Sequence, residues 1–248
     1  MEENSEIIVA LDTNSPDEAV SLVDRLMPEI TMYKVGMELF YSCGAGIIDR
    51  LAALGAKIFL DLKLHDIPVT VGRAMAALAR PGVDILDVHA SGGSRMMKEG
   101  LAAVRGAAQA RGVRPPKVIG VTLLTSIDRE IFSREIAPGC DRNLVEHVVR
   151  MARLAKESGL DGVVTSAFEV GAIREACGPN FITVVPGVRP AWAADAHDQR
   201  RCMTPRQAVL AGADYLVVGR PITRARSPRD AAARLLDEVR EARRDARG

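Results

Sequence analysis

The feature that most constrains the fold is a series of eight short, apolar and β-branched segments that recur along the whole chain. Near-continuous apolar strands are typical of a parallel sheet buried on both faces. Each segment is therefore predicted to be a strand of such a sheet. The predicted strands are residues 7–12, 33–37, 57–63, 83–89, 118–122, 162–165, 181–186 and 215–219.

Stretches with a helical pattern separate these strands. Three of them begin with a capping residue followed by proline, at Ser15-Pro16, Thr204-Pro205 and Ser227-Pro228, which is a strong signal for a helix start. The charged tail after Leu236 is expected to be a solvated helix end. No Pro- or Ser-rich linker divides the 248 residues.

Alternation of strand and helix repeated eight times predicts an α/β fold, a single (β/α)8 TIM barrel over residues 1–248. An open doubly wound sheet is the alternative. That fold usually carries a G-x-G-x-x-G motif after its first strand, and this chain has none there.

Charge and cysteine content exclude several classes of protein. The 33 basic residues nearly balance the 32 acidic ones, whereas a nucleic-acid-binding protein usually has a basic excess. The four cysteines lie far apart without a C-x-x-C pair, which argues against a zinc site and a disulfide framework. We expect free thiols in a reducing cytosol.

The N-terminal sequence MEENSEIIVA is acidic and lacks the apolar core of a signal peptide. No apolar run reaches the ~18 residues that a membrane span needs. The sequence therefore predicts a cytoplasmic protein without membrane association.

Candidate functional residues, nearly all of them polar or charged, fall at the ends of most predicted strands. Because a TIM barrel carries its chemistry at the carboxyl ends of its strands, these residues are together predicted to form one site. They are Asp12, Lys34, Asp61, Lys63, His89, Thr122, Gly219 and Arg220.

The densest group lies on the third predicted strand. Strand side chains alternate, so Asp61 and Lys63 share a face with the apolar Phe59 and point into the barrel. Lys34 on the neighbouring strand can join them. The alternative interpretation is a buried ion pair that only fixes the strand, because buried charges need partners.

Asp66 follows this strand and has two equally good interpretations. It is either a functional carboxylate or the N-cap of a helix that contains Pro68. His65 is expected to be structural or exposed, and His89 to pack or form a hydrogen bond at the rim. No two histidines have metal-ligand spacing, so no metal site is predicted.

Two later segments are suited to phosphate. The long polar loop around residues 187–204 contains Arg189 and Gln199, and such loops in compact barrels are often lids. Gly219 exposes backbone N–H groups at the end of the eighth strand, next to the bidentate cation Arg220. TIM barrels often bind phosphate at this position.

These motifs resemble those of the orotidine 5'-phosphate decarboxylase family. The stretch DLKLHDIPVT from Asp61 to Thr70 resembles the family signature D-x-K-x-x-D-I-P. The similarity covers almost the whole chain in the same order. The other matching stretches are KVGMELF at 34–40, LTS at 124–126, PGVR at 186–189, DQRR at 198–201 and VVGR at 217–220.

The resemblance implies decarboxylation of orotidine 5'-phosphate to UMP and CO₂ without a cofactor, the last step of UMP biosynthesis. Lys34, Asp61, Lys63 and Asp66 would form an alternating charge network, with Lys63 as the proton donor. Asp66 would belong to the site of the neighbouring subunit, so the enzyme would be a homodimer with shared active sites.

The remaining substrate contacts are also implied by the resemblance. Asp12 and Lys34 would hold ribose hydroxyls, and Thr70 would join them from the partner subunit. Thr125 and Ser126 would contact the pyrimidine. The phosphate would be held by Arg189, Gln199, Gly219 and Arg220. Ile67, within the signature motif, would also belong to the substrate site. One departure is that residues 189–199 are about one residue longer than the family pattern and carry Trp192 and His197.

Two other functions are compatible with parts of this pattern. Mg²⁺-dependent sugar-phosphate decarboxylases or aldolases share D-x-K-x-x-D, but typically have an acidic residue on the second strand, where this chain has Lys34. A non-catalytic phosphate-binding barrel would use Gly219 and Arg220. It would have no use for Asp61, Lys63 and Asp66 together.

Overall fold

The computed structural model of the chain describes residues 6–139, 143–193 and 203–247. Its eight strands pair side by side in chain order, and β8 pairs with β1 to close a fully parallel barrel. The strands are β1 Glu6–Ala10, β2 Met32–Gly36, β3 Lys57–Leu64, β4 Val83–His89, β5 Lys117–Val121, β6 Gly162–Val164, β7 Ile182–Pro186 and β8 Tyr215–Val218.

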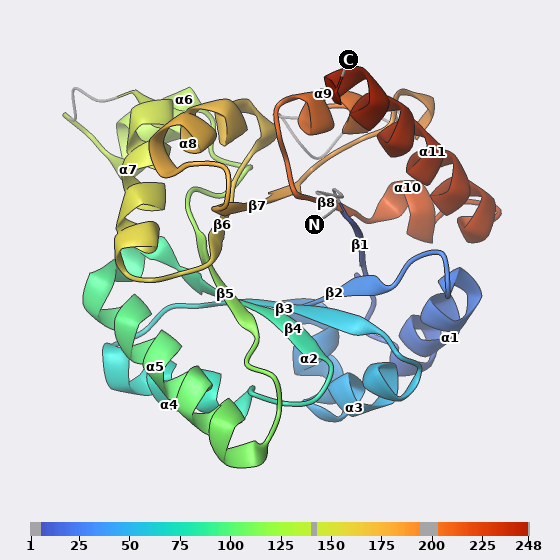
Figure 1. Cartoon of the computed structure of the whole chain (residues 1–248), viewed down its shortest axis with the longest axis horizontal. Helices are drawn as coiled ribbons and strands as arrows, with labels where there is room; N and C mark the ends of the chain where they lie inside the picture. Colours follow the sequence, from blue (N-terminus) through green and yellow to red (C-terminus); the bar gives the residue numbers. More distant parts are fainter. Residues whose placement is uncertain (1–5, 140–142, 194–202, 248) are drawn as a thin grey trace.

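Helices surround this barrel (Figure 1), so the predicted (β/α)8 fold is confirmed and the open sheet is wrong. The expected strands agree with the observed ones to within two residues. The α-helices are α1 Pro16–Leu26, α2 Met37–Cys43, α3 Gly46–Ala53, α4 Pro68–Ala77, α5 Gly93–Arg111, α6 Arg129–Ile131, α7 Leu144–Glu157, α8 Val170–Cys177, α9 Pro205–Leu210, α10 Arg220–Thr223 and α11 Pro228–Arg247.

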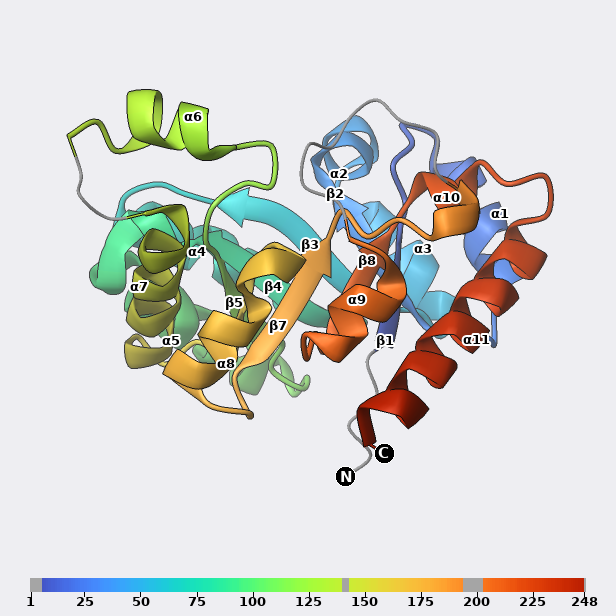
Figure 2. The ribbon, with the colours of Figure 1, turned by 90° about the horizontal axis from the view of Figure 1, so that it is seen from above.

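Short helical turns complete the connections. They are η1 Ala90–Gly92, η2 Phe132–Ile136, η3 Ala167–Glu169 and η4 Ala191–Ala193, of which η2 is a π-helix. The segment that contains α6 and η2 stands clear of the strands in the side view (Figure 2). No helix within the described residues is long and apolar enough to cross a membrane.

The predicted helix starts are confirmed. Ser15 caps α1 by accepting a hydrogen bond from the Glu18 backbone amide at 3.3 Å. Thr204 forms a complete capping box with Gln207 at the start of α9, and Ser227 accepts from an amide in the first turn of α11. These caps satisfy backbone donors that the helices leave unpaired.

The charged C-terminal tail is not a solvated helix end, as the sequence had suggested. It continues α11 to Arg247 as one amphipathic helix, and Val239 and Ala242 in it are buried against the main core. Val239 and Ala242 are three positions apart and therefore lie on one face of the helix, and this apolar face is sufficient to anchor the charged tail.

Two layers of apolar side chains hold the barrel together. The larger core lies between the strands and the surrounding helices, and a smaller one fills the barrel interior. Phe59 belongs to the interior core, which confirms that its face of β3 points inward. The interior residues are Ile8, Ala10, Met32, Phe59, Ile85, Ile119, Val184 and Val217.

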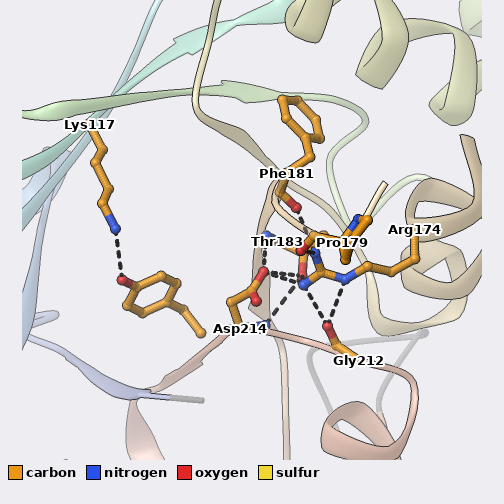
Figure 3. A network of polar contacts seen from close by, with 8 residues as sticks. Lys117, Arg174, Pro179, Phe181, Thr183, Gly212 and Asp214 are labelled. Atoms are coloured by element: carbon orange, nitrogen blue, oxygen red, sulfur yellow. Dashed lines mark hydrogen bonds and ion pairs between the residues drawn. The ribbon is translucent and has the colours of Figure 1, made fainter. Parts of the chain in front are cut away.

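Polar contacts close the opposite end of the barrel, where the strands begin (Figure 3). Arg174 of α8 donates to the carbonyl oxygens of Pro179, Phe181 and Gly212 and pairs with Asp214. Across the same end, Lys117 Nζ lies 3.4 Å from the Tyr215 hydroxyl. This end of a TIM barrel generally serves stability.

Candidate active site

An irregular segment at the end of β3 shapes the site. Leu60 pairs with Leu86 and Leu64 pairs with Val88, so three residues of β3, 61–63, lie opposite the single residue Asp87 of β4. Bulges of this kind re-aim side chains and are common beside active sites.

Lys63 adopts a left-handed backbone conformation within this bulge. Its φ of 51° is positive, the only such value for a non-glycine residue in the described part of the chain. A side chain at Cβ makes this conformation unfavourable, so it needs support from its surroundings. The Lys63 amide donates a hydrogen bond to Asp87 Oδ1 at 2.8 Å.

Four charged side chains meet at the carboxyl end of the first three strands. Lys63 Nζ lies 2.5 Å from Asp61 Oδ1, and Lys34 Nζ lies 3.6 Å from Asp61 Oδ2. Lys34 also contacts Asp12 Oδ1 at 3.1 Å. The predictions that Asp61 and Lys63 share a face and that Lys34 joins them are confirmed.

The environment favours the charged forms of Asp61 and Lys34. Burial alone would raise the pKa of Asp61, but the neighbouring Asp87 carboxyl group and the charges of Lys34 and Lys63 outweigh it and lower the pKa. Burial likewise opposes the charged form of Lys34, yet the carboxylates of Asp61 and Asp12 raise its pKa. Opposite charges at this range favour the ionised forms.

Asp87 is a buried carboxyl group of the site that the sequence reasoning missed. Its exposed fraction is 1%, and burial together with the neighbouring Asp61 carboxylate raises its pKa well above the usual range. The available signal was the alternation in VDILDVH, which puts Asp87 on the same inward face as Ile85.

Asp66, Ile67 and Thr70 lie on the exposed surface just beyond β3. The N-cap interpretation of Asp66 is wrong, because the N-cap of α4 is Ile67 and no side chain caps that helix. Asp66 Oδ1 instead accepts from the Ile67 amide at 2.6 Å. Among the described residues, the Lys63 ammonium pairs with Asp61 and not with Asp66 of the same chain.

The two histidines near β3 and β4 form a stacked pair. The rings of His65 and His89 lie 5.3 Å apart between centroids, and His89 Nδ1 lies 2.7 Å from Ser91 Oγ. The expectation of a hydrogen bond by His89 at the rim is therefore confirmed. Burial, and then the charges of His65 and Lys63, lower the pKa of His89.

The residues expected to contact the pyrimidine follow β5 at the same rim. Thr125 is half-buried and Ser126 is exposed, in the loop between β5 and α6. Thr122, which directly follows β5, is buried and donates to the Val164 carbonyl at 2.9 Å. That bond ties the ends of β5 and β6 together.

The expected phosphate region lies beyond β7 and β8. The Arg189 amide donates to the Met203 carbonyl at 3.0 Å, which joins the two described ends of the 187–204 loop. Gly219 precedes α10, and Arg220 is the first residue of that helix. A Cβ on Gly219 would lie 3.4 Å from Asp12 Oδ2, so this region adjoins the charged cluster. Gln199 lies outside the described residues.

The tryptophan that departs from the family pattern packs at the start of this loop. Trp192 lies in η4, partly buried against the main core, with the Arg234 guanidinium 4.7 Å from its ring centroid. Such a cation–π contact links the loop to α11. His197, the other departing residue, lies outside the described residues.

The charged cluster is poorly suited to a metal ion. Within residues 6–139, 143–193 and 203–247, no group of three His, Cys, Asp or Glu side chains is placed to hold one. Both carboxylate oxygens of Asp61 face ammonium groups, from Lys63 and Lys34. A cation would be repelled by these two lysines.

The fold is that of a (β/α)8 barrel, and it carries a lysine–aspartate cluster at the carboxyl ends of its strands, where the enzymes of this fold place their active sites. A sequence model of the "Orotidine 5'-phosphate decarboxylase / HUMPS family" matches residues 5–235. The chain belongs to this family.

Individual relatives agree with that assignment. An orotidine 5'-phosphate decarboxylase of Moorella thermoacetica is 50% identical over 239 residues, which is 96% of this chain and 94% of the relative. Another, of a Nostoc species, is 48% identical and covers 95% and 98%. The solved structure of the Lactobacillus acidophilus orotidine 5'-phosphate decarboxylase has a TM-score of 0.82 at 39% identity, covering 95% of this chain and 99% of that one.

Proposed function

We propose that this chain decarboxylates orotidine 5'-phosphate to UMP and CO₂ without a cofactor, the last step of UMP biosynthesis. The observation that carries the proposal is the buried Asp61 carboxylate held between the ammonium groups of Lys63 and Lys34 at the barrel mouth. The relatives at 48–50% identity bear the name of this enzyme.

The chemistry explains why a cofactor-free enzyme needs such a cluster. Loss of CO₂ breaks the bond between C6 and the carboxylate carbon and leaves the electron pair on C6, where no adjacent π-acceptor receives it. Preorganised charge is then the available source of stabilisation. The Lys63 ammonium stabilises the developing negative charge on C6 and then transfers a proton to it.

Asp61 has two roles in this step. It holds Lys63 Nζ at 2.5 Å and so keeps the proton donor oriented. Its negative charge also lies beside the substrate carboxylate and repels it, and that repulsion disappears when the carboxylate becomes neutral CO₂. Lys34 offsets part of the charge of Asp61 and, with Asp12, holds the ribose hydroxyls.

The phosphate and pyrimidine are held by residues at the rest of the rim. Arg220, the Gly219 backbone, Arg189 and Gln199 bind the phosphate, and Thr125 and Ser126 contact the base. The phosphate is remote from the bond that breaks, so its binding energy serves to organise the site.

The proposal includes a homodimer whose partner subunit supplies Asp66, Ile67 and Thr70 to each site. Two observations support it. Asp66 is exposed, and the Lys63 ammonium of its own chain pairs with Asp61 instead. Large apolar side chains are exposed directly around it, with Ile67 66% and Val69 50% exposed, and exposed apolar patches often mark interfaces. A cytoplasmic location stays a prediction.

A direct ultraviolet assay tests the reaction. Purified protein and orotidine 5'-phosphate are mixed in EDTA, and loss of the orotate absorbance is followed for the wild type and for Lys63→Ala. We expect turnover by the wild type and a loss of at least ~10²–10⁴-fold in the variant, the usual contribution of a proton-transfer group. A folded wild type that binds UMP without turnover would indicate a non-catalytic barrel. A folded wild type that turns over a sugar phosphate with Mg²⁺, but not orotidine 5'-phosphate, would indicate the sugar-phosphate relatives.

A further inference from the structure

We propose that Asp87 is a positioning residue of this active site: a neutral carboxyl group that anchors the Lys63 backbone and donates a hydrogen bond to Asp61. Its effect on turnover rests on the proposed decarboxylation. Its protonation state can be tested without any reaction.

The first support is the backbone of the proton donor. Asp87 is the one residue of β4 that lies opposite the three-residue bulge 61–63 of β3. Its Oδ1 accepts the Lys63 amide at 2.8 Å. Because Lys63 has a positive φ of 51°, which side chains disfavour, this hydrogen bond fixes the point from which the Lys63 side chain leaves the strand.

The second support is the burial of the other oxygen. Asp87 is 1% exposed, and among the described residues its buried Oδ2 receives no hydrogen bond. An ionised carboxylate without partners is costly in such a place. A proton on Oδ2 changes that atom into a donor, and the Asp61 carboxylate beside it is the acceptor. Both carboxyl groups are then satisfied.

The charges around Asp87 favour the neutral form. From β3, Asp61 repels an ionised Asp87, and Lys63 alone offsets this repulsion among the described groups. Lys34 of β2 pairs with Asp61. From β5, the residue in register is the apolar Ile119. The two carboxyl groups therefore carry a single negative charge between them, and that charge is on Asp61 while Asp87 is neutral.

The consequence is a division of roles between two neighbouring aspartates. Asp61 carries the charge that faces Lys63 and the substrate. Asp87 carries a proton, lies beneath the site and holds both Asp61 and the Lys63 backbone in place. Because Asp87 belongs to β4, which lies four strands away from β8 in the closed barrel, its loss should affect turnover more than binding of the ligand phosphate.

Two substitutions separate this role from simple packing. Asp87→Asn keeps an acceptor for the Lys63 amide and a donor for Asp61, so kcat should stay within about threefold of the wild type. Asp87→Leu has a similar shape but neither group, so kcat should fall about 10–100-fold. The affinity for UMP, measured by calorimetry, should change less than kcat in both variants. Asp84→Asn, on the same strand at the opposite end of the barrel, is the control.

The pH dependence of unfolding tests the proton on Asp87 without reference to turnover. A carboxyl group with a raised pKa in the folded state stabilises the protein below its unfolded pKa of about 3.9, and this stability is lost as the pH rises toward the folded pKa. The stability of Asp87→Asn relative to the wild type should therefore increase from about pH 4 to pH 8 in urea unfolding.

The outcomes distinguish this proposal from the proposed function. If the wild type shows no turnover but unfolding has the expected pH dependence, the proposed decarboxylation is wrong and the proposal that Asp87 is neutral still holds. Equal losses of kcat in Asp87→Asn and Asp87→Leu would overturn the positioning role, as would full activity of Asp87→Leu. If Asp87→Leu does not fold, a stability difference between Asp87→Asn and the wild type that is independent of pH overturns the proposal.

Discussion

Gly36, the last residue of β2, leaves the space that the Lys34 ammonium occupies. A Cβ built on Gly36 would lie 2.8 Å from Lys34 Nζ and 3.8 Å from Asp12 Oδ1. The lysine terminus can move away at little cost in stability, but it would then leave Asp12 and Asp61. The absence of a side chain at this position is therefore part of the site.

We expect Gly36→Ala to reduce kcat/KM about tenfold or more, the equivalent of one charge-assisted hydrogen bond, while the melting temperature changes little. Steady-state kinetics and thermal unfolding measure the two quantities. Gly106→Ala is the matched control, because a Cβ there meets nothing within 4 Å. Full activity of Gly36→Ala would show that Lys34 does not need its observed position.

Arg220 allows a second test of a single side chain. If it holds the substrate phosphate, Arg220→Ala should lose about 10–100-fold or more in kcat/KM, because charge-assisted hydrogen bonds contribute ~1.5–3 kcal/mol each. The exposed Arg226 nearby provides the control variant Arg226→Ala, for which we expect no change. An unchanged kcat/KM for Arg220→Ala would refute its phosphate role.

The third strand shows what the sequence could and could not predict. Its apolar pattern predicts a strand, and the alternation of Phe59, Asp61 and Lys63 correctly predicts an inward charged face. The bulge and the left-handed Lys63 are not predictable in this way. They depend on the hydrogen bond to Asp87, which is 24 residues away in the sequence.

Helix ends show the same division between local and tertiary information. Ser15 and Thr204 cap their helices through contacts within three residues, so the sequence predicts them. Asp66 has the right residue type and spacing for a cap, yet the chain begins α4 with Ile67 as the N-cap. The burial of Val239 and Ala242 depends on packing against distant elements. It is not predictable from the sequence, because charged residues surround both positions.

Arg174 of α8 links its helix to the starts of β7 and β8, which leads to a prediction about stability. Its guanidinium satisfies three backbone carbonyls and pairs with Asp214 (Figure 3). Arg174→Met should lower the free energy of unfolding by about 2–4 kcal/mol, because partly buried acceptors and a carboxylate lose their partner.

In thermal unfolding, the loss of stability in Arg174→Met should appear as a decrease of roughly 5–15 °C in the melting temperature. Turnover at 25 °C should be unchanged, because these contacts lie at the end of the barrel opposite the charged cluster. Arg50→Met removes an exposed ion pair with Asp17 and should change the free energy of unfolding by no more than about 1 kcal/mol. Equal effects of the two variants would contradict the structural importance of Arg174.

The whole molecule presents an apolar surface at the same rim as the charged cluster. Exposed large side chains follow the ends of several strands, including Met37 after β2, Ile67 and Val69 after β3, and Leu124 after β5. Asp66 and Thr70 lie among the residues after β3. A symmetric dimer that covers this surface would bring Asp66 of one subunit toward the site of the other.

A complementation experiment tests the shared site. Lys63→Ala and Asp66→Asn should each be nearly inactive as pure dimers. In a heterodimer of the two, the Asp66→Asn chain keeps Lys63 and receives an intact Asp66 from its partner, so one complete site forms. After random exchange of an equal mixture, about one quarter of the wild-type activity should return.

The control is a mixture of Lys63→Ala with Asp61→Asn. Asp61 and Lys63 pair within one chain at 2.5 Å, so each site of that heterodimer lacks one of them and no activity should return. Recovery in the first mixture and none in the second assigns Asp66 to the partner's site. If neither mixture recovers although sedimentation shows that subunits have exchanged, Asp66 acts within its own chain or has no role in turnover.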